Sequence, residues 1–419
     1  MRMRKKDQSS FPTTLSCEEA RKSLLEQTNE VTGYENLNIR SAINRILDKD
    51  LQCPVNVPLH TNSAMDGYAV KHADLSIDGN SQLNLVGTAY AGKPYKKTVE
   101  NRTAVNIMTG AAMPQGTDTV IILEDVQRKD DKIIIKPGHT KGQNVRHAGE
   151  DLEMGAKCLR AGRRLTASDI GLVASLGITE LRVRRRIKVA FFSTGDELKS
   201  LGETLDLGEI YDSNRYTLYG LLHDFGADII DMGVVKDDPT LLATALKTAS
   251  ESADAIITSG GVSVGEADHI KSVLQSIGTI KFWKIMMKPG RPLAFGKIGS
   301  ADFFGLPGNP ISSAACFRFF IIPFLHSSMD VSGDNPIVAK IKNTFTKKKN
   351  FTRFIKGRVS FSNKGQAEFK IFKGQESYKI NPFTKSNAWG FFPKGKTIFK
   401  KGTFIKCYTP TGINELFIK

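Results

Sequence analysis

The chain has 419 residues, of which 40% are hydrophobic, so it is long enough to fold into roughly three or four domains with a core in each. It contains no run of about 18 or more apolar residues, and its basic and polar start lacks the apolar stretch of a signal peptide, so we expect a cytoplasmic protein without a membrane span. Its five cysteines form no CxxC pair, so we expect reduced thiols and neither a disulfide framework nor a zinc site. The net charge of +16 does not by itself indicate nucleic-acid binding, because from Ser328 onward there are 19 Lys and Arg against 5 Asp and Glu, and the preceding residues are close to neutral.

Residues 11–52 are expected to be rich in helix. Ser16 precedes the segment CEEARKSLLEQ and Ser41 precedes AINRILDKD, and each serine is a polar cap in front of residues with helical spacing. From about 53 to 147 the pattern changes to short β-type runs separated by Gly and Pro, which predicts a small β-rich unit. Another helix is predicted in TASDIGLVASLG, with Thr166 as its cap and Asp169 in its first turn.

Strand-like and helix-like segments alternate from 186 to 327, which predicts a mostly parallel, doubly wound sheet covered on both faces. The tail from 328 has alternating strands with turn residues between them, which is typical of a small β-barrel. We therefore expect a multidomain α/β plus β protein. Its parts would be a discontinuous helical domain (15–52 and 148–185), an inserted β-rich domain (53–147), a central α/β domain (186–327) and a C-terminal barrel (328–419).

The expected site lies at the carboxyl ends of the strands of the α/β domain, where backbone N–H groups and helix starts attract anions. Two segments rich in small and acidic residues follow predicted strands there. They contain Ser193, Thr194, Gly195, Asp196 and Glu197 in the first, and Ser259, Gly260, Gly261, Ser263 and Asp268 in the second. Glycines let backbone amides approach a phosphate, and carboxylates suit a divalent metal that bridges phosphate oxygens. The alternative is that the two glycines only form a tight turn and Asp268 only caps the next helix.

Two further turns belong to the same end of the predicted sheet. Pro239 fits the first position of a helix, so Asp238 is the expected cap and Asp237 the freer carboxylate. The other turn consists of Pro307, Gly308 and Asn309 and comes directly before Pro310. It is interpreted either as a ligand turn or as a helix start capped by Asn309.

A basic turn ends another strand of this region. Lys284 and Lys288 flank a pair of methionines, and Lys288 opens the sequence Lys288, Pro289, Gly290, Arg291. Such a turn can aim ammonium and guanidinium groups into an oxyanion site, and a solvent-exposed basic turn is the alternative.

Two clusters of small and polar residues in the β-rich unit contain Asp66 and Thr109, and the junction back to the helical domain contains Arg146 and Asp151. Read alone, these clusters are interpreted as turns and as an ion pair at a domain junction. The chain has no Ser/His/Asp order, no histidine cluster and no Walker-type GxxxxGK[ST] motif, so covalent nucleophilic catalysis is not indicated.

Together these motifs resemble one family, the molybdopterin molybdenumtransferases, which includes the bacterial MoeA proteins and gephyrin E domains. The resemblance runs from about residue 15 to 325. It is carried, in the order of the family, by NSAMDGYAV, IMTGA, DTVIILED, RHAGED, STGDEL, YDSN, ITSGGVSVGEAD, MKPGRPLAFG and GLPGNP.

The resemblance implies a homodimer of four-domain subunits that converts adenylyl-molybdopterin and molybdate to molybdenum cofactor and AMP, with Mg²⁺ as the cation. It implies metal-binding and catalytic roles for Glu197, Asp237 and Asp268, and catalytic, oxyanion-holding roles for Lys284 and Lys288. It also implies a cleft between subunits, in which the third domain of one chain is faced by residues from its partner. These residues match Asp66, Thr109, Arg146 and Asp151.

The sequence departs from the family pattern in two places. Arg291 stands where the family often has Lys, which changes the geometry of oxyanion binding. The tail resembles the fourth domain of the family only loosely, and the register of its candidate site residues stays open: Arg353, Lys356, Gln375, Ser377, Ser386 and Asn387.

The basic tail and the enzymatic activity each leave alternatives. The excess charge of the tail is most simply a solvated face; attraction of anionic pterin and molybdate comes next, and nucleic acid third. The rival functions are adenylation of molybdopterin with ATP and a scaffold that binds partner proteins. We expect no nucleic-acid or membrane partner, and consider other proteins of molybdenum-cofactor biosynthesis as partners.

Overall fold

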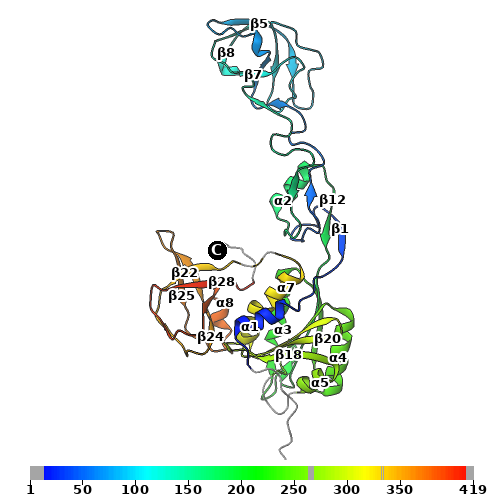
Figure 1. Ribbon diagram of the computed structural model, residues 1–419, viewed down its shortest axis with the longest axis vertical. Helices are drawn as coiled ribbons and strands as arrows, with labels where there is room; N and C mark the ends of the chain where they lie inside the picture. The colour runs from blue at the N-terminus through cyan, green and yellow to red at the C-terminus, as the bar shows by residue number, and fades with distance from the viewer. Residues whose placement is uncertain (1–13, 263–268, 332, 334, 412–419) are drawn as a thin grey trace, which may run out of the picture. The chain divides into compact units, whose positions relative to one another are not determined.

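The computed structural model describes residues 14–262, 269–331, 333 and 335–411. The chain forms two compact units. Unit 1 contains the residues up to 35, residues 44–46 and everything from 184 onward, and unit 2 contains residues 36–43 and 47–183. Figure 1 identifies the helices and strands of each unit. The four-domain division expected from the sequence remains a prediction.

Unit 2 is built mainly from β-strands, and the sequence predicts these for its residues 53–147. Its largest sheet has six strands in the order β7-β4-β6-β5-β9-β8. The strands are β4 (Gly67–Val70), β5 (Ser81–Ala89), β6 (Thr103–Ile107), β7 (Thr119–Ile122), β8 (Val126–Lys129) and β9 (Lys132–Ile135). Alternate residues supply two apolar clusters: Tyr68 and Val70 belong to one, and Ala69 to the other. Short strand pairs connect this sheet to the rest of the unit: β2 (Leu51–Gln52) with β11 (Lys157–Leu159), and β3 (Asn62–Ser63) with β10 (Val145–Arg146).

The two helices expected in and beside unit 2 have opposite outcomes. Helix α2 (Ala167–Ser175) begins with the capping box of Thr166 and Asp169, which confirms the prediction. The helix predicted after Ser41 is wrong, because residues 41–44 form a turn. Asn44 takes a left-handed φ of 63°, which interrupts any helix. Leu47 instead forms a β-bridge with Val183, which belongs to β12 (Glu180–Arg184); this strand pairs with β1 (Tyr34–Asn38).

Unit 1 contains the predicted doubly wound sheet, with strand order β16-β13-β17-β21-β20-β18. The strands are β13 (Lys188–Thr194), β16 (Asp228–Val235), β17 (Ala255–Ser259), β18 (Gly278–Lys284), β20 (Pro292–Ile298) and β21 (Ala301–Leu306). The pairs β13·β16, β13·β17 and β17·β21 are parallel, and only β20 runs against its two neighbours. The carboxyl ends of five strands and the amino end of β20 therefore share one edge of the sheet.

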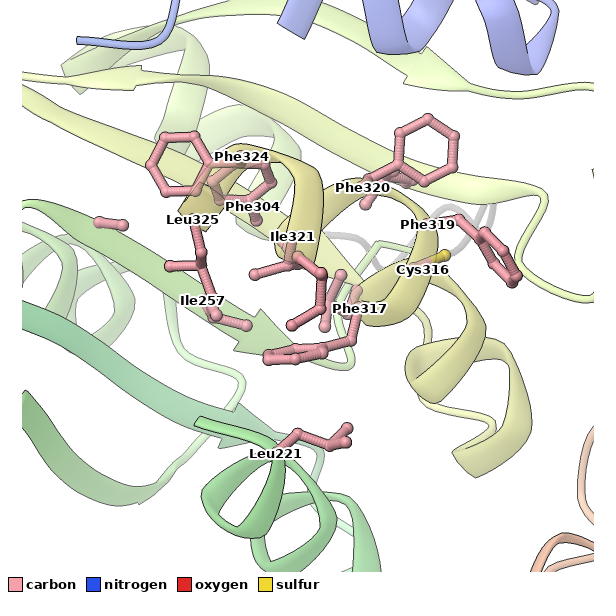
Figure 2. Close-up of a cluster of buried hydrophobic side chains, with 14 of the residues drawn as sticks. Leu221, Ile257, Phe304, Cys316, Phe317, Phe319, Phe320, Ile321, Phe324 and Leu325 are labelled. Carbon is pink, nitrogen blue, oxygen red and sulfur yellow. The ribbon is translucent and has the colours of Figure 1, made fainter. Parts of the chain in front are cut away.

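Period-two alternation places the two helical layers on opposite faces of this sheet. Val189 and Phe191 pack in the cluster that includes α3 (Ser213–Phe225), while Ala190 and Phe192 pack in the cluster that includes α4 (Pro239–Ser252) and α5 (His269–Ile277) (Figure 1). The first cluster is aromatic, and Figure 2 shows Phe304 of β21 among Phe317, Phe320 and Phe324 of the helix that follows it. Ring centroids of Phe304 and Phe324 are 4.9 Å apart.

That following helix is the most apolar of unit 1. Segments α6 (Pro310–Cys316), a π-helical turn (Phe317–Ile321) and α7 (Ile322–Ser328) run without a break over Pro310–Ser328. This stretch of 19 residues is long and apolar enough to cross a membrane by length and composition alone. However, 83% of its apolar 18-residue part is buried inside the protein. Helix α1 (Cys17–Leu25), which has the capping box of Ser16 and Glu19, packs in the same cluster.

The tail of unit 1 forms the predicted barrel. Strands β24 (Thr352–Phe361), β25 (Ala367–Ile371), β22 (Ile337–Ile341), β28 (Phe404–Tyr408) and β26 (Ala388–Phe392) pair in this order, and β26 closes the ring by pairing with β24. Short β23 (Phe345–Thr346) pairs with β27 (Ile398–Phe399), and α8 (Asn381–Thr384) precedes β26. Strand β19 (Met287–Lys288) joins β24 in parallel, so the basic turn is tied to the barrel.

Candidate functional site

The carboxyl edge of the unit 1 sheet brings together most of the predicted site residues. Ser193 pairs with Ser259, and Ser259 pairs with Leu306, so the segments after β13, β17 and β21 lie next to one another. Thr194 pairs with Val235, which places Asp237 two residues beyond the end of β16. These pairings gather a set predicted from separate motifs: Ser193, Thr194, Gly195, Asp196, Glu197, Asp237, Ser259, Gly260, Gly261, Pro307, Gly308 and Asn309. Ser263 and Asp268 lie outside the described residues.

The glycine pair after β17 is required by the turn itself. Gly260 has φ of 93° and Gly261 has φ of 63°. A Cβ on Gly260 would lie 2.2 Å from the backbone oxygen of Thr194, and one on Gly261 would lie 2.5 Å from Ile270 Cδ1. Gly308 differs, because a Cβ there would have no heavy atom nearer than 3.9 Å. Local packing therefore accounts for Gly260 and Gly261, whereas it does not account for Gly308.

Asn214 is a site residue that the sequence prediction left out. It lies near the start of α3, is buried, and donates from Nδ2 to Ser259 Oγ and to the Gly308 carbonyl, each at 2.8 Å. It thereby joins three segments of the sheet edge. The YDSN motif that contains it was recognised, but only the folded chain brings Asn214 to the other two turns.

The carboxylates of the sheet edge differ in burial. Asp238 caps α4 by accepting hydrogen bonds from the N–H groups of Thr240 and Leu241, both at 2.9 Å, as predicted. Asp237 is half-buried, while Asp196 and Glu197 are exposed. Asn309 occupies the cap position of α6, but its side chain makes no capping hydrogen bond. Among the described carboxylates Asp196, Glu197 and Asp237, it is thus Asp237 that is partly removed from solvent.

The oxygen atoms at this edge suit a hard cation that takes further ligands from phosphate and water. Ser193 Oγ and Thr194 Oγ1 are buried and have no hydrogen-bond partner in the described part of the chain. Within that same part, no group of three or more His, Cys, Asp or Glu residues is arranged to hold a metal ion. A cation here would thus need oxygens of the substrate or of residues beyond the described ranges.

The basic turn lies at the same edge and continues into the barrel. Lys284 is the last residue of β18 and pairs with Pro292. Lys288 pairs with Arg353 of β24, so their side chains stand on the same face. Gly290 has φ of 92°, and a Cβ there would lie 2.7 Å from Cys316 Sγ. The close packing beneath Gly290 fixes the turn between Lys288 and Arg291.

A cavity of about 410 Å³, here called the oxyanion cavity, lies between the basic turn and the barrel. Its cationic lining consists of Lys288, Arg291, Lys348 and Arg353, and Glu376 is its one acidic lining residue. The remaining lining residues are Met287, Pro289, Gly290, Pro292, Ser312, Phe351, Gln375 and Ser377. Lys284 is not among the lining residues. The Glu376 carboxylate is engaged elsewhere, by Lys379 Nζ at 3.0 Å.

Arg353 gives the oxyanion cavity a partly desolvated positive charge. Burial lowers the pKa of its guanidinium, and its buried Nε has no hydrogen-bond partner in the described part of the chain. Its guanidinium carbon lies 6.0 Å from the ring centre of Phe345. Burial, and then the charge of Arg353, also lowers the pKa of nearby Lys347. A cation with unused donors and no carboxylate partner among the described residues is suited to bind an incoming anion.

The candidates in unit 2 form a separate group. Asp66 Oδ1 accepts hydrogen bonds from the backbone N–H of Thr109 at 2.6 Å and from its hydroxyl at 2.7 Å. These two bonds lower the pKa of the Asp66 carboxyl, so it is ionised at neutral pH. Arg146, in β10, and Asp151 are exposed. Unit 2 therefore offers an ionised carboxylate, a hydroxyl and a cation.

The barrel contributes site residues that the sequence could not place. Arg353, Gln375 and Ser377 line the oxyanion cavity, whereas Lys356 does not. Asn387 is used within the barrel, where its side chain bonds to the backbone of Val359. The cavity residues of the barrel come close to Lys288 through the pairing of β19 with β24, which joins residues about 65 positions apart.

Comparisons with known proteins cover nearly the whole chain. Residues 15–177 match the MoeA N-terminal region (domain I and II), residues 190–327 match the "Probable molybdopterin binding domain", and residues 338–409 match the MoeA C-terminal region (domain IV). A molybdopterin molybdenumtransferase of Haemophilus influenzae is 41% identical over 90% of this chain and 93% of its own. One of Nostoc is 33% identical over 91% and 89%. The crystal structure of a molybdopterin biosynthesis MoeA protein from Pyrococcus horikoshii has a TM-score of 0.83 at 26% identity, covering 95% of this chain and 100% of that one.

Proposed function

We propose that this chain, which belongs to the MoeA family of molybdopterin molybdenumtransferases, inserts molybdate into adenylyl-molybdopterin and releases AMP and molybdenum cofactor. One observation carries the proposal: the oxyanion cavity, lined by four cationic residues of which Arg353 is partly desolvated, adjoins the edge of the sheet where buried hydroxyls and close-packed glycines gather. The cavity suits molybdate, and the sheet edge suits the phosphates of the adenylylated pterin.

The residues divide the work between these two places. Lys288 and Arg291 hold the oxyanion from one wall of the cavity, and Arg353 holds it from the other. The backbone N–H of Gly308 and the hydroxyls of Ser193 and Thr194 are the donors that we assign to the phosphate chain, while Lys284 offsets its charge. The N–H of Gly260 instead donates to the Leu306 carbonyl at 3.0 Å and holds the turn. Asp237, with Asp268 and Glu197, would hold Mg²⁺, and these carboxylates would orient the attacking oxygen. When bound, Mg²⁺ offsets the charge that develops on phosphate oxygens as the bond to AMP breaks.

The decisive experiment measures AMP and molybdenum cofactor formed from adenylyl-molybdopterin, with molybdate or tungstate, with and without Mg²⁺. Asp237→Asn should abolish AMP release, because a carboxamide cannot replace the charge of a metal-binding carboxylate. Asp238→Asn is the matched control, since Asn also caps helices and should preserve both α4 and activity. Equal activity of the two variants would refute the role of Asp237. Asp268→Asn should lose AMP release as Asp237→Asn does.

The alternative reaction has a direct test. An adenylyltransferase would convert ATP and molybdopterin to adenylyl-molybdopterin, and we expect no such product here. The extra matches at 15–177 and 338–409 favour insertion over this reaction. A pure binding scaffold is disfavoured by the cationic cavity beside the sheet edge, and would release no AMP at all.

We further propose a cytoplasmic homodimer in which Asp66, Thr109, Arg146 and Asp151 complete the site of the partner chain. Mixing Asp66→Asn with Asp237→Asn tests this. If each site combines unit 2 of one chain with the sheet edge of the other, a mixed dimer keeps one intact site, and an equal mixture should recover about a quarter of wild-type activity. A mixture as inactive as either variant alone would refute the shared site.

A further inference from the structure

Lys356 is a buried lysine whose ammonium binds backbone oxygens. Its side chain in β24 is 1% exposed. Nζ donates hydrogen bonds to the carbonyl of Glu376 at 3.2 Å and to that of Lys379 at 3.0 Å. Burial lowers its pKa to about 8, so the ammonium form persists at neutral pH despite poor solvation.

The bonds of Lys356 have a particular target, the segment 372–379 that follows β25. Gln375 completes the attachment: its Oε1 accepts from the Lys356 N–H at 3.0 Å, and its Nε2 donates to the Lys356 carbonyl at 2.8 Å and to the Phe372 carbonyl at 2.9 Å. The Glu376 carboxylate is bound instead by Lys379 Nζ at 3.0 Å. Lys356 therefore holds the segment by its backbone.

The segment held in this way forms one wall of the oxyanion cavity. Gln375, Glu376 and Ser377 all line the cavity. The Ser377 carbonyl accepts a hydrogen bond from the N–H of Ile311 at 3.0 Å, which ties the segment to the first turn of α6. Ser312, the next residue of that turn, lines the cavity too. The segment thus bridges the barrel and the α/β sheet.

A lysine is an expensive residue for this position in terms of stability. Burying an ammonium group is unfavourable unless its donors are satisfied, and apolar replacements of buried charged groups are often neutral or stabilising. The face of β24 that carries Lys356 offers such an environment, because Phe354, two residues earlier on the same face, is buried in the aromatic cluster. What the ammonium adds over an apolar side chain is a pair of directed bonds to segment 372–379.

We propose that Lys356 is a positioning residue for oxyanion binding: its buried ammonium fixes segment 372–379 so that Gln375 and Ser377 stand opposite the turn of Lys288 and Arg291. Lys356 does not contact the oxyanion. This inference rests on the proposed function, and it predicts that loss of the ammonium weakens molybdate binding while binding of the adenylylated pterin at the sheet edge is retained.

The test compares Lys356→Met with Lys373→Met by calorimetric titration with molybdate and, separately, with adenylyl-molybdopterin. Lys356→Met should raise the Kd for molybdate by about tenfold or more, since small displacements of positioned groups have effects of this size. Its Kd for the pterin should stay within about twofold of wild type. Lys373→Met removes an exposed charge from the same segment but none of its backbone bonds, and Lys373 does not line the cavity, so this variant should bind both ligands like wild type.

Hydrogen exchange supplies a readout independent of activity. In Lys356→Met the amides of segment 372–379 and of Ile311 should exchange faster, whereas those of Phe369 and Ile405 in the barrel core should keep their protection. If Lys356→Met does not fold, Gln375→Met tests the same attachment, because it removes the amide bonds to β24; it should show the same faster exchange and weaker molybdate binding.

The outcomes separate the two proposals. If Lys356→Met binds molybdate as tightly as the wild-type protein does, the positioning role is overturned and the proposed function stays intact. Equal loss of both ligands would also overturn it, because it would indicate general disruption of the fold. Failure of the wild-type protein to bind molybdate would overturn both proposals.

Discussion

Replacing Arg353 with methionine should weaken molybdate binding and, at the same time, leave the ligand-free protein as stable as wild type or more stable. Arg353 carries a partly desolvated charge, and its buried Nε has no hydrogen-bond partner among the residues that the structure describes. Removing it relieves the cost of burying an unpaired cation. The opposing loss is small, because the contact with the Phe345 ring, at 6.0 Å, contributes only about 0.5–1 kcal/mol.

The loss of affinity follows from the bonds that the guanidinium would make. A hydrogen bond between charged groups contributes about 1.5–3 kcal/mol. Since each 1.4 kcal/mol is a factor of ten, the Kd for molybdate should rise roughly ten- to 150-fold. Lys288 pairs with Arg353 across β19 and β24, so one cation would remain beside the vacant position and binding should be weakened but not abolished.

Two measurements check this pair of effects. Calorimetric titration gives the Kd, and urea unfolding without ligand gives the free energy of unfolding. Added molybdate should stabilise the wild-type protein by about 2.7 kcal/mol at a hundred times its Kd, and the variant should need a correspondingly higher concentration. Unchanged affinity, or a ligand-free variant destabilised by more than about 2 kcal/mol, would refute the reasoning, because Arg353 would then be a structural residue.

Three further predictions concern the sheet. Burial raises the pKa of Asp302 to about 6. The folded chain therefore binds a proton between pH 6 and about 4 that the unfolded chain does not bind. Asp302→Asn should raise the free energy of unfolding by about 2 kcal/mol at pH 7.5, and urea titration should find this gain lost by about pH 4. Gly260→Ala should destabilise the protein by about 2 kcal/mol or more, since its Cβ would meet Thr194. Gly308→Ala should instead keep the wild-type melting temperature and lose AMP release. Equal stability of the two alanine variants would contradict this prediction. Asn214→Ala should cost about 1–3 kcal/mol in thermal unfolding, because the buried Ser259 hydroxyl and the partly buried Gly308 carbonyl lose their donor, and an unchanged melting temperature would count against its role in joining the turns.

Local signals made much of the fold predictable. The caps at Ser16 and Thr166 and the proline after Asp238 work within a single turn of chain, so their outcome is decided by neighbouring residues. Ser41 carries the same kind of signal and fails. Farther along the same segment, Ile46 and Leu47 are buried in different apolar clusters. Burial of these neighbours in two separate clusters outweighs the helical spacing of the sequence.

The site was predictable where one rule of sheet topology applies. Residues after parallel strands must meet at one edge, which is why Thr194, Asp237 and Gly260 were found from separate motifs. Arg353 and Ser377 were not placed, because no rule of periodicity says which barrel strand receives β19. Asn214 was left out because its partners, Ser259 and a backbone carbonyl, are distant in the sequence.

The uneven charge of the chain acquires a physical reason from the oxyanion cavity. A cation that already has a carboxylate partner must break that pair before it can bind an anion, so an effective anion site keeps its cations unpaired. From Ser328 onward there are only 5 Asp and Glu for 19 Lys and Arg, and the barrel therefore cannot neutralise its own charge. The sheet edge has the opposite character, with Asp237 and buried hydroxyls. Placing the cations of Arg353 and Lys348 on the barrel keeps them apart from those carboxylates in the sequence. The pairing of β19 with β24 places Lys288 beside Arg353 in the cavity lining, so the proposed oxyanion binding depends on this short pairing.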